Sequence, residues 1–152
     1  MKIQKILCPT DFSAASDHAL GEAVDLAKAL GAKIKVIHVF QRPIGVALEG
    51  APVTIEAAEQ FLQQAHAELK KVLEDLRKDW QDKGVELEVE LIEGAPYSAI
   101  VEEAAQCDLV VMATHGRTGF QRFMLGSVAE RVVRTSNCPV MTIPIEKIAA
   151  KS

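Results

Sequence analysis

The chain has 152 residues, of which 49% are hydrophobic and 25% charged, and this composition is typical of one globular domain. Its formal net charge of −4 argues against a nucleic-acid surface, which depends on a concentrated basic field. No apolar run approaches the roughly 20 residues that cross a bilayer, and Met1 to Cys8 is too short for a signal peptide. We therefore expect a cytoplasmic protein with no nucleic-acid partner and no membrane insertion, folded as a single domain over residues 1–152.

The cysteines argue against metal or redox catalysis. Cys8, Cys107 and Cys138 are an odd number and form no CxxC pair. Zinc binding and thioredoxin-like chemistry both use closely spaced pairs. We therefore expect buried free thiols in a reducing compartment.

The chain opens with a strand pattern followed by a helix pattern. Ile3 to Cys8 is a short apolar run stopped by Pro9, which predicts a buried strand. Ala14 to Leu30 carries small apolar residues at three- and four-residue spacing, which predicts a helix. Asp11 or Ser13 is suited to cap the start of that helix.

The next elements are a strand, a loop and a long helix. Gly31 is placed to end the first helix, and Lys33 to Phe40 is rich in β-branched residues, which predicts a second strand. Gln41 to Val53 contains two prolines and two glycines and predicts a long loop. A helix is expected from about Thr54 to Lys83. Its predicted apolar face consists of Leu62, Ala65, Leu69, Val72, Leu76 and Trp80.

A third strand and a third helix follow. Val85 to Ile92 begins with strict alternation of apolar residues and glutamates, which predicts an edge strand with one solvated face. Pro96 is suited to the first turn of a helix that reaches about Ala105.

The patterns in the last third of the chain predict a strand, a helix and a final strand. Asp108 to Ala113 is continuously apolar after its first residue, as in a strand covered on both faces. A glycine-rich segment leads into a helix from about Ser127 to Thr135. The last strand, Val140 to Ile145, is bracketed by Pro139 and Pro144, and proline favours an edge position.

This order, βαβαβαβαβ, predicts an α/β fold: a three-layer sandwich around a five-stranded parallel sheet with right-handed crossovers. With the third and fifth strands at the edges, the strand order is 3-2-1-4-5, a Rossmann-like arrangement. Ligands of such sheets bind beyond the carboxyl ends of the strands where the order reverses. We therefore expect the segments Pro9-Thr10-Asp11 and Ala113-Thr114-His115-Gly116 to meet there.

The glycine-rich segment is suited to phosphate. Gly116, Gly119 and Gly126 leave the backbone open to close approach, and Arg117 and Arg122 add positive charge. Ser127 and Glu130 form an S-x-x-E pattern, which predicts a capping box at a helix start where N–H groups attract anions. An ordinary turn and an ordinary cap are the alternative interpretation. The segment matches neither the Walker A loop nor the GxGxxG fingerprint.

The same segment resembles the ATP-binding signature of the universal stress protein family, G-x2-G-x9-G-[ST], through Gly116, nine residues and Gly126-Ser127. The resemblance extends over essentially the whole chain. Its other parts are Ile6 to Ser13, His38-Val39, and Ser136 to Val140. One position departs from the signature, because its first glycine is Ala113 here.

The resemblance implies a bound ATP, or AMP or ADP, with Mg²⁺ or Mn²⁺ bridging the phosphates. It implies that Asp11 and the backbone of Val39 hold the adenine and ribose. The implied wall and phosphate residues are Pro9, Thr10, Ala113, His115, Gly116 and Arg117, together with the N–H groups of Gly126, Ser127 and Val128. No residue is assigned a catalytic or metal-ligating role. His115 and His38 are expected to be structural, with His115 fixing its loop by a side-chain hydrogen bond.

These observations favour an ATP-binding regulatory protein with little or no turnover, because no group evidently positions water at a γ-phosphate. A dimeric interaction protein that binds no nucleotide is the alternative. An adenylating enzyme of the related adenine nucleotide alpha-hydrolase-like fold is disfavoured, because the S-G-G-x-D-type loop is missing after the first strand. The resemblance also implies a homodimer through Val140 to Ile145, and an apolar edge strand invites such pairing.

Overall fold

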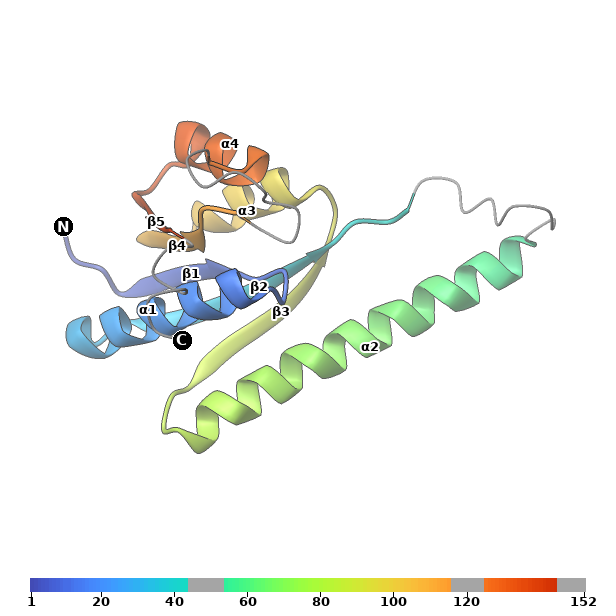
Figure 1. Cartoon of the computed structure of the whole chain (residues 1–152), viewed down its shortest axis with the longest axis horizontal. Coiled ribbons are helices and arrows are strands. Elements are labelled where there is room, and N and C mark those ends of the chain that lie inside the picture. The colour runs from blue at the N-terminus through green and yellow to red at the C-terminus, as the bar shows by residue number, and fades with distance from the viewer. Residues whose placement is uncertain (44–53, 116–124, 145–152) are drawn as a thin grey trace.

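The computed structural model describes residues 1–43, 54–115 and 125–144. Strands and helices alternate along the chain as predicted (Figure 1). The strands are β1 (Lys5–Pro9), β2 (Lys33–Phe40), β3 (Leu87–Glu93), β4 (Leu109–Ala113) and β5 (Val140–Ile143). The helices are α1 (Ala14–Leu30), α2 (Ile55–Asp82), α3 (Pro96–Ala104) and α4 (Ser127–Thr135).

The sheet has the predicted order β3-β2-β1-β4-β5, and every pairing in it is parallel. β1 lies at the centre, where Ile6 pairs with Ile34 of β2 on one side and with Leu109 of β4 on the other. The chain therefore leaves β1 toward one edge and returns past it toward the other edge. The reversal falls between β1 and β4, where the sequence predicts the ligand site.

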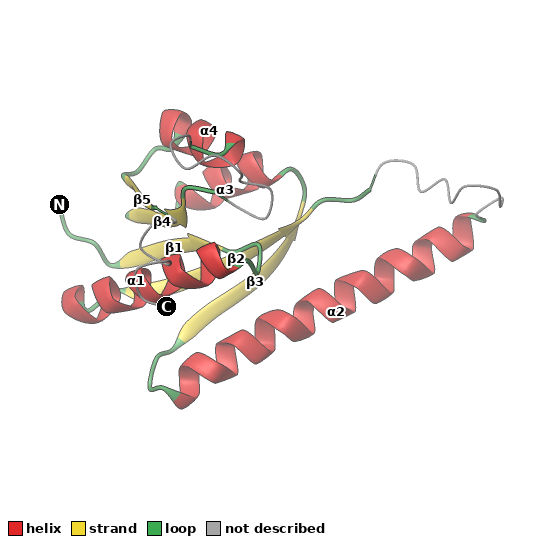
Figure 2. Ribbon diagram, in the orientation of Figure 1, coloured by secondary structure: helices red, strands yellow, loops and turns green. Residues whose placement is uncertain are grey.

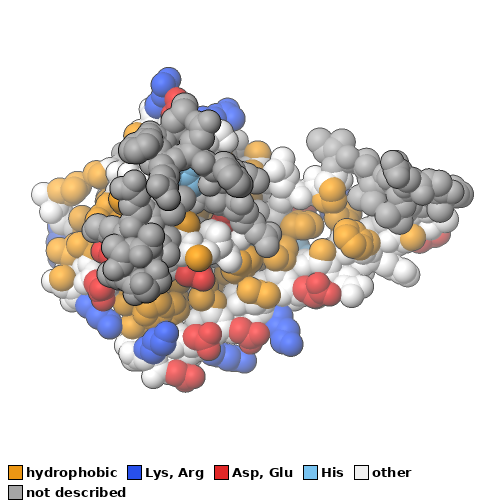
Figure 3. Space-filling view, in the orientation of Figure 1, with side chains coloured by type: hydrophobic (Ala, Val, Ile, Leu, Met, Phe, Trp, Pro, Cys, Tyr) orange, Lys and Arg blue, Asp and Glu red, His pale blue; other side chains and the backbone are white. Residues whose placement is uncertain are grey.

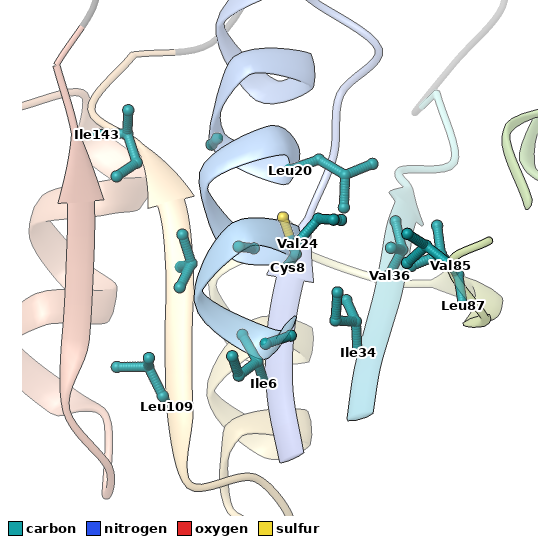
Figure 4. Close-up of a cluster of buried hydrophobic side chains, with 14 of the residues drawn as sticks. Ile6, Cys8, Leu20, Val24, Ile34, Val36, Val85, Leu87, Leu109 and Ile143 are labelled. Carbon is teal, nitrogen blue, oxygen red and sulfur yellow. The ribbon is translucent and has the colours of Figure 1, made fainter. Parts of the chain in front are cut away.

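Helices cover both faces of the sheet, which makes three layers (Figure 2). Alternate strand residues point to opposite faces, so Ile6 and Cys8 of β1 face α1 and α2, whereas Leu7 faces α3 and α4. We call the two clusters the α1/α2 core and the α3/α4 core. Figure 4 shows Leu20 and Val24 of α1, Cys8 of β1 and Val36 of β2 among the side chains of the α1/α2 core.

The ends of α1 show why the helix lies where the sequence predicts it. The Ser13 hydroxyl accepts a hydrogen bond from the backbone N–H of Ser16 at 3.2 Å, so Ser13 is the N-terminal cap and Asp11 is not. Gly31 ends the helix with φ 66°, a left-handed conformation that glycine adopts without steric cost.

The predicted apolar face of α2 was wrong at one position. Leu73 is 2% exposed, whereas Val72 is 44% exposed. Leu76 and Trp80 pack with Leu73 onto the α1/α2 core, and the N-terminal part of the helix extends past the sheet (Figure 1). Hydrophobic side chains continue along this projecting part (Figure 3). Among the described residues, no helix is both long enough and apolar enough to cross a membrane.

The solvated face of β3 carries a cluster of charges. Lys35 of β2 is 6% exposed, and its ammonium group forms ion pairs with Glu88 at 3.7 Å, Glu90 at 2.5 Å and Glu103 of α3 at 2.6 Å. Burial alone would lower the pKa of Lys35, but the hydrogen bonds that its ammonium group donates to Glu103 and Glu90 outweigh burial and raise the pKa. The glutamates of the edge strand thus fix β3 to β2 and α3.

The other edge strand is shorter than predicted. β5 ends at Ile143, and Pro144 lies outside the strand because it has no N–H to donate. The last residue of the predicted strand, Ile145, lies outside the described residues.

Candidate functional site

A cleft of about 650 Å³ opens at the carboxyl ends of β1, β2 and β4. Its walls are the segments that follow these strands together with the first turns of α3 and α4. This volume lies in the range of small-molecule and cofactor sites. The location is the one predicted from the strand order.

The cleft brings together nine of the eleven residues predicted for the site. The lining includes Pro9, Thr10, Asp11, Val39, Ala113, His115, Gly126, Ser127 and Val128. The other two, Gly116 and Arg117, lie outside the described residues, as do Gly119 and Arg122.

The loop from β1 to α1 is held by its own polar side chains. Thr10 is 6% exposed, and its Oγ1 accepts a hydrogen bond from the backbone N–H of Phe12 at 3.0 Å and lies 3.0 Å from Oγ of Ser16. Oδ1 of Asp11 accepts from the backbone N–H of Ser13 at 3.0 Å and from its hydroxyl at 2.5 Å. Asp11 therefore supports the cap of α1 and lines the cleft at the same time.

His38 joins this loop to β2. Its Nδ1 lies 2.8 Å from the carbonyl oxygen of Thr10, and because a carbonyl only accepts, Nδ1 carries the proton. The His38 ring lies against the ring of Phe12, with 4.5 Å between centroids. Phe12 has φ 60°, a left-handed conformation uncommon for a bulky residue. The expectation that His38 is structural is confirmed by this bond, yet His38 also lines the cleft.

The opposite wall is formed where β4 leads to α4. The backbone N–H of Gly126 donates to the carbonyl oxygen of Thr114 at 2.8 Å. A Cβ on Gly126 would lie 3.2 Å from the same oxygen, so close backbone approach, and not its φ of −61°, favours glycine here. The expectation that the Gly126 N–H faces a phosphate was wrong, because this donor is already bonded within the chain.

The capping box predicted for Ser127 and Glu130 was also wrong. Gly126 is the N-terminal cap and Ser127 is the first helical residue, so the Ser127 hydroxyl is one position too late to cap. The first helical hydrogen bond in α4 runs from the N–H of Glu130 to the carbonyl of Gly126. The N–H groups of Ser127 and Val128 precede that bond and lie at the positive end of the helix, which attracts anions.

Two further residues of the signature region have defined surroundings. Ala113 ends β4 and pairs in register with Ile143 of β5, and it lines the cleft. His115 is 9% exposed, and its Nδ1 lies 3.0 Å from Oγ1 of Thr114. This is the side-chain hydrogen bond expected of His115.

Carboxylates near the cleft do not form a metal centre by themselves. Burial, with a contribution from the charge of Asp11, raises the pKa of Asp17 above its ordinary value. Within residues 1–43, 54–115 and 125–144, no group of three or more His, Cys, Asp and Glu side chains is placed to hold a metal ion.

Several lining residues were missed by sequence reasoning. Pro96 and Ile100 begin α3 at the carboxyl end of β3, and the strand order alone could have indicated them. Ser16 lies outside every motif, and His38, although part of the family resemblance, was expected to be structural; both line the cleft. The remaining missed residues are Gln41, Met112 and Ala129, whereas Thr114 belongs to a segment that was expected at the site.

The arrangement is suited to binding a ligand that is apolar at one end and anionic at the other. Val39, Ile100 and Met112 supply apolar wall, while the first turn of α4 supplies N–H donors. Such a division of apolar surface and few polar groups is typical of cofactor sites.

Comparisons with known proteins agree on one family. The model of the universal stress protein family matches residues 2–144. Universal stress protein MJ0531 of Methanocaldococcus jannaschii is 36% identical over 144 residues, covering 92% of this chain and 81% of that protein. Universal stress protein YxiE of Bacillus subtilis is 31% identical, covering 91% of this chain and 97% of its own length.

Solved structures share the fold. The structure of MJ0577, also of Methanocaldococcus jannaschii, superposes with TM-score 0.78 at 28% identity, covering 94% of this chain and 96% of that one. A universal stress protein in complex with cAMP has TM-score 0.68 at 23% identity, covering 95% and 98%. The universal stress protein of Archaeoglobus fulgidus in complex with dAMP has TM-score 0.61 at 24% identity, covering 94% and 99%.

Proposed function

Because the chain belongs to the universal stress protein family and opens a cleft at the reversal point of its sheet, we propose that it binds ATP, or AMP or ADP, in that cleft. The single observation that carries the proposal is the lining: nine residues that the family resemblance implied for the site meet there. The family members solved with cAMP and dAMP, at 23% and 24% identity, share the fold with this chain and support an adenine nucleotide by analogy.

In this proposal the nucleotide lies across the sheet reversal. Asp11 and the backbone of Val39 hold the ribose and adenine against the apolar wall. The phosphates extend toward Ser127 and Val128, whose N–H groups lie at the positive end of α4. Gly116 and Arg117 would approach the α- and β-phosphates. Mg²⁺ or Mn²⁺ would be held by the phosphate oxygens, which suits Mg²⁺ because it commonly binds through substrate phosphates.

We propose a regulatory role for this binding, as a nucleotide-dependent switch or partner-binding module with little or no turnover. Hydrolysis uses a group that positions or deprotonates water. His115 is the histidine nearest the signature, and it is buried and bonded to Thr114. The proposal includes a homodimer that forms through β5 at the edge of the sheet.

Calorimetric titration of ATP with Mg²⁺ into nucleotide-stripped protein tests the proposal. We expect a dissociation constant in the micromolar range, about −8 kcal/mol, and loss of measurable binding in Gly126→Val. The branched side chain would crowd Thr114 and the space in front of the first turn of α4. Gly21→Val is the matched control, because a Cβ at Gly21 meets no atom within 4 Å and Gly21 does not line the cleft.

Two results would contradict the proposal. Absence of heat with folded wild-type protein at millimolar ATP would exclude nucleotide binding and favour an interaction protein of the same fold. Phosphate release at about 10 s⁻¹, the median turnover of enzymes, would contradict the switch even if binding were tight.

A further inference from the structure

Ser16, on the first turn of α1, joins the two ends of the loop segment that carries Asp11. Its Oγ donates a hydrogen bond to the carbonyl oxygen of Ser13 at 2.9 Å and lies 3.0 Å from Oγ1 of Thr10. Thr10 and Ser13 stand on either side of Asp11 and Phe12 in the chain. Ser16 is 4% exposed, and it lines the cleft together with Thr10 and Asp11. The Ser16 side chain therefore closes a ring around the segment that presents Asp11 to the cleft.

The partners of these hydroxyl groups fix the direction of each proton. A carbonyl oxygen only accepts, so the Ser16 hydroxyl donates its one proton to Ser13. The Thr10 hydroxyl is therefore the donor in its contact with Ser16, while Thr10 Oγ1 accepts from the backbone N–H of Phe12 at 3.0 Å. The Ser13 hydroxyl lies 2.5 Å from Oδ1 of Asp11 and 3.4 Å from Oγ of Ser16, and the shorter contact takes its proton. The loop thus presents an acceptor to the cleft, the Asp11 carboxylate, and no hydroxyl donor.

An acceptor that is held in place selects ligands by the hydroxyl groups they carry. The ribose of a nucleotide has such donors, and a hydrogen bond to a charged group is stronger than one between neutral groups. Hydrogen bonds weaken steeply when their geometry is distorted. A site built to bond a hydroxyl therefore rejects an analogue that lacks it, provided that the acceptor stays in position.

We propose that Ser16 is a positioning residue that gives the cleft its selectivity for ribose. The inference rests on the proposed nucleotide site, in which Asp11 holds the ribose. The Ser16 hydroxyl ties Thr10 and Ser13 to α1, so the Asp11 carboxylate is in place before the ligand arrives, and such preorganisation increases affinity. Ser16 acts through these residues and does not itself bind the nucleotide.

Ser16→Ala removes this tie and leaves the helix start intact. The cap of α1 uses the backbone N–H of Ser16, which donates to Oγ of Ser13 at 3.2 Å and is unaffected by the change. The Ser13 carbonyl also keeps a second donor, the N–H of Asp17 at 3.0 Å. The variant therefore acts mainly on the link to Thr10. Thr10→Val, which is close in shape, breaks the same link from the other side.

The experiment titrates ATP and dideoxy-ATP, which lacks both ribose hydroxyls, into each nucleotide-stripped protein in the presence of Mg²⁺. We expect the wild type to bind ATP about 10–100-fold more tightly than the dideoxy analogue. In Ser16→Ala and in Thr10→Val this ratio should fall by about 3–10-fold, while the dissociation constant of the dideoxy analogue stays near its wild-type value. The double variant should show a ratio close to that of Thr10→Val alone, because both changes remove one bond.

Ser98→Ala is the matched control. Ser98 is an exposed residue in the first turn of α3, and it does not line the cleft. This variant loses a hydroxyl from a helix start without touching the loop that carries Asp11, and it should keep the wild-type ratio.

The contrary outcomes separate this inference from the proposed function. Equal binding of ATP and dideoxy-ATP by the wild type would overturn the inference and leave nucleotide binding in place. An unchanged ratio in Ser16→Ala, or an equal loss of affinity for both nucleotides, would show that Ser16 does not position the ribose acceptor. If Ser16→Ala folds poorly, the ratio in Thr10→Val decides. Absence of binding of either nucleotide to the folded wild type would contradict the proposed function itself, and the inference with it.

Discussion

Nδ1 of His38 donates a hydrogen bond to the carbonyl oxygen of Thr10 across 2.8 Å, and this contact ties the loop after β1 to the end of β2. Both residues line the cleft. The ring of Phe12, in its left-handed conformation, rests on the same imidazole. The His38 side chain thus contacts Thr10 and Phe12, the two residues on either side of Asp11.

His38→Phe tests this role, because it keeps a ring against Phe12 and removes the donor to Thr10. A buried carbonyl left without its partner costs about 1–2 kcal/mol. We expect the dissociation constant for ATP to rise about 5–10-fold and the thermal midpoint to fall by a few degrees. Calorimetry and a thermal scan measure the two effects.

His66→Phe is the matched control for that variant. His66 lies on α2, and its ring packs against the Phe40 ring in a T-shaped arrangement with 6.2 Å between the ring centroids. His66 does not line the cleft. Its affinity for ATP should equal that of the wild type. Equal affinity in both variants would show that the His38–Thr10 bond does not position the loop.

Asp108 makes stability depend on acid pH. Its Oδ2 accepts hydrogen bonds from the backbone N–H groups of Gln4 at 2.8 Å and Lys5 at 2.9 Å, which lower the pKa of this carboxyl below its ordinary value. A carboxyl whose pKa is lower in the folded state than in the unfolded state stabilises the fold at pH values above its unfolded-state pKa, which is about 3.9. This stabilisation disappears as the pH falls through the folded-state pKa.

Asp108→Asn should therefore melt a few degrees below wild type at pH 7, and the gap should close between about pH 4 and pH 2. Thermal scans across this range measure the gap. Asp25→Asn, at an exposed position of α1, provides the comparison and should show no such gap. A constant difference for Asp108→Asn at every pH would mean that the carboxylate charge is not responsible.

The free edge of β5 offers a test of the proposed dimer. The carbonyl groups of Pro139 and Ile143 accept hydrogen bonds from the backbone N–H groups of Val110 and Thr114 of the β4 segment. The backbone N–H and C=O groups of the odd-numbered residues in this segment therefore point toward β4. Residues of a parallel strand alternate in direction, and the N–H of Thr142 therefore points to the open edge. Thr142→Pro removes that donor and leaves the bonds to β4 in place.

We expect Thr142→Pro to shift a dimer to a monomer in light scattering after gel filtration, with the far-ultraviolet circular dichroism unchanged. Thr142→Val keeps the N–H and should remain dimeric. A dimer that survives Thr142→Pro would place the subunit contact elsewhere.

The periodicity of the sequence predicted the fold well because the helices bury one face, while a continuous apolar run such as Leu109–Ala113 indicates a strand covered on both faces. α1 and β2 have the predicted bounds, since Ser13 and Gly31 are local signals read from the sequence alone. The face of α2 was misassigned because Val72 and Leu73 are both apolar, and only the packing of α2 against β3 decides which is buried.

The cleft was predicted in position but less well in detail. Its position follows from strand order, which is a property of the whole chain. The roles of individual donors depend on bonds between distant segments, such as the one from Gly126 to Thr114. No local pattern indicates that this N–H is already used, nor that His38 reaches Thr10.

The charge cluster on β3 has an evolutionary consequence, because its members are unequal. Loss of Glu88 or Glu90 leaves the ammonium of Lys35 with other partners, whereas loss of Lys35 removes one ion-pair partner from Glu88, Glu90 and Glu103 at once, and of these Glu88 keeps Lys5 at 3.4 Å. In proteins that descend from this chain, the glutamates should therefore be substituted before the lysine is. A lineage that has replaced the lysine should carry neutral residues at the positions of its former partners.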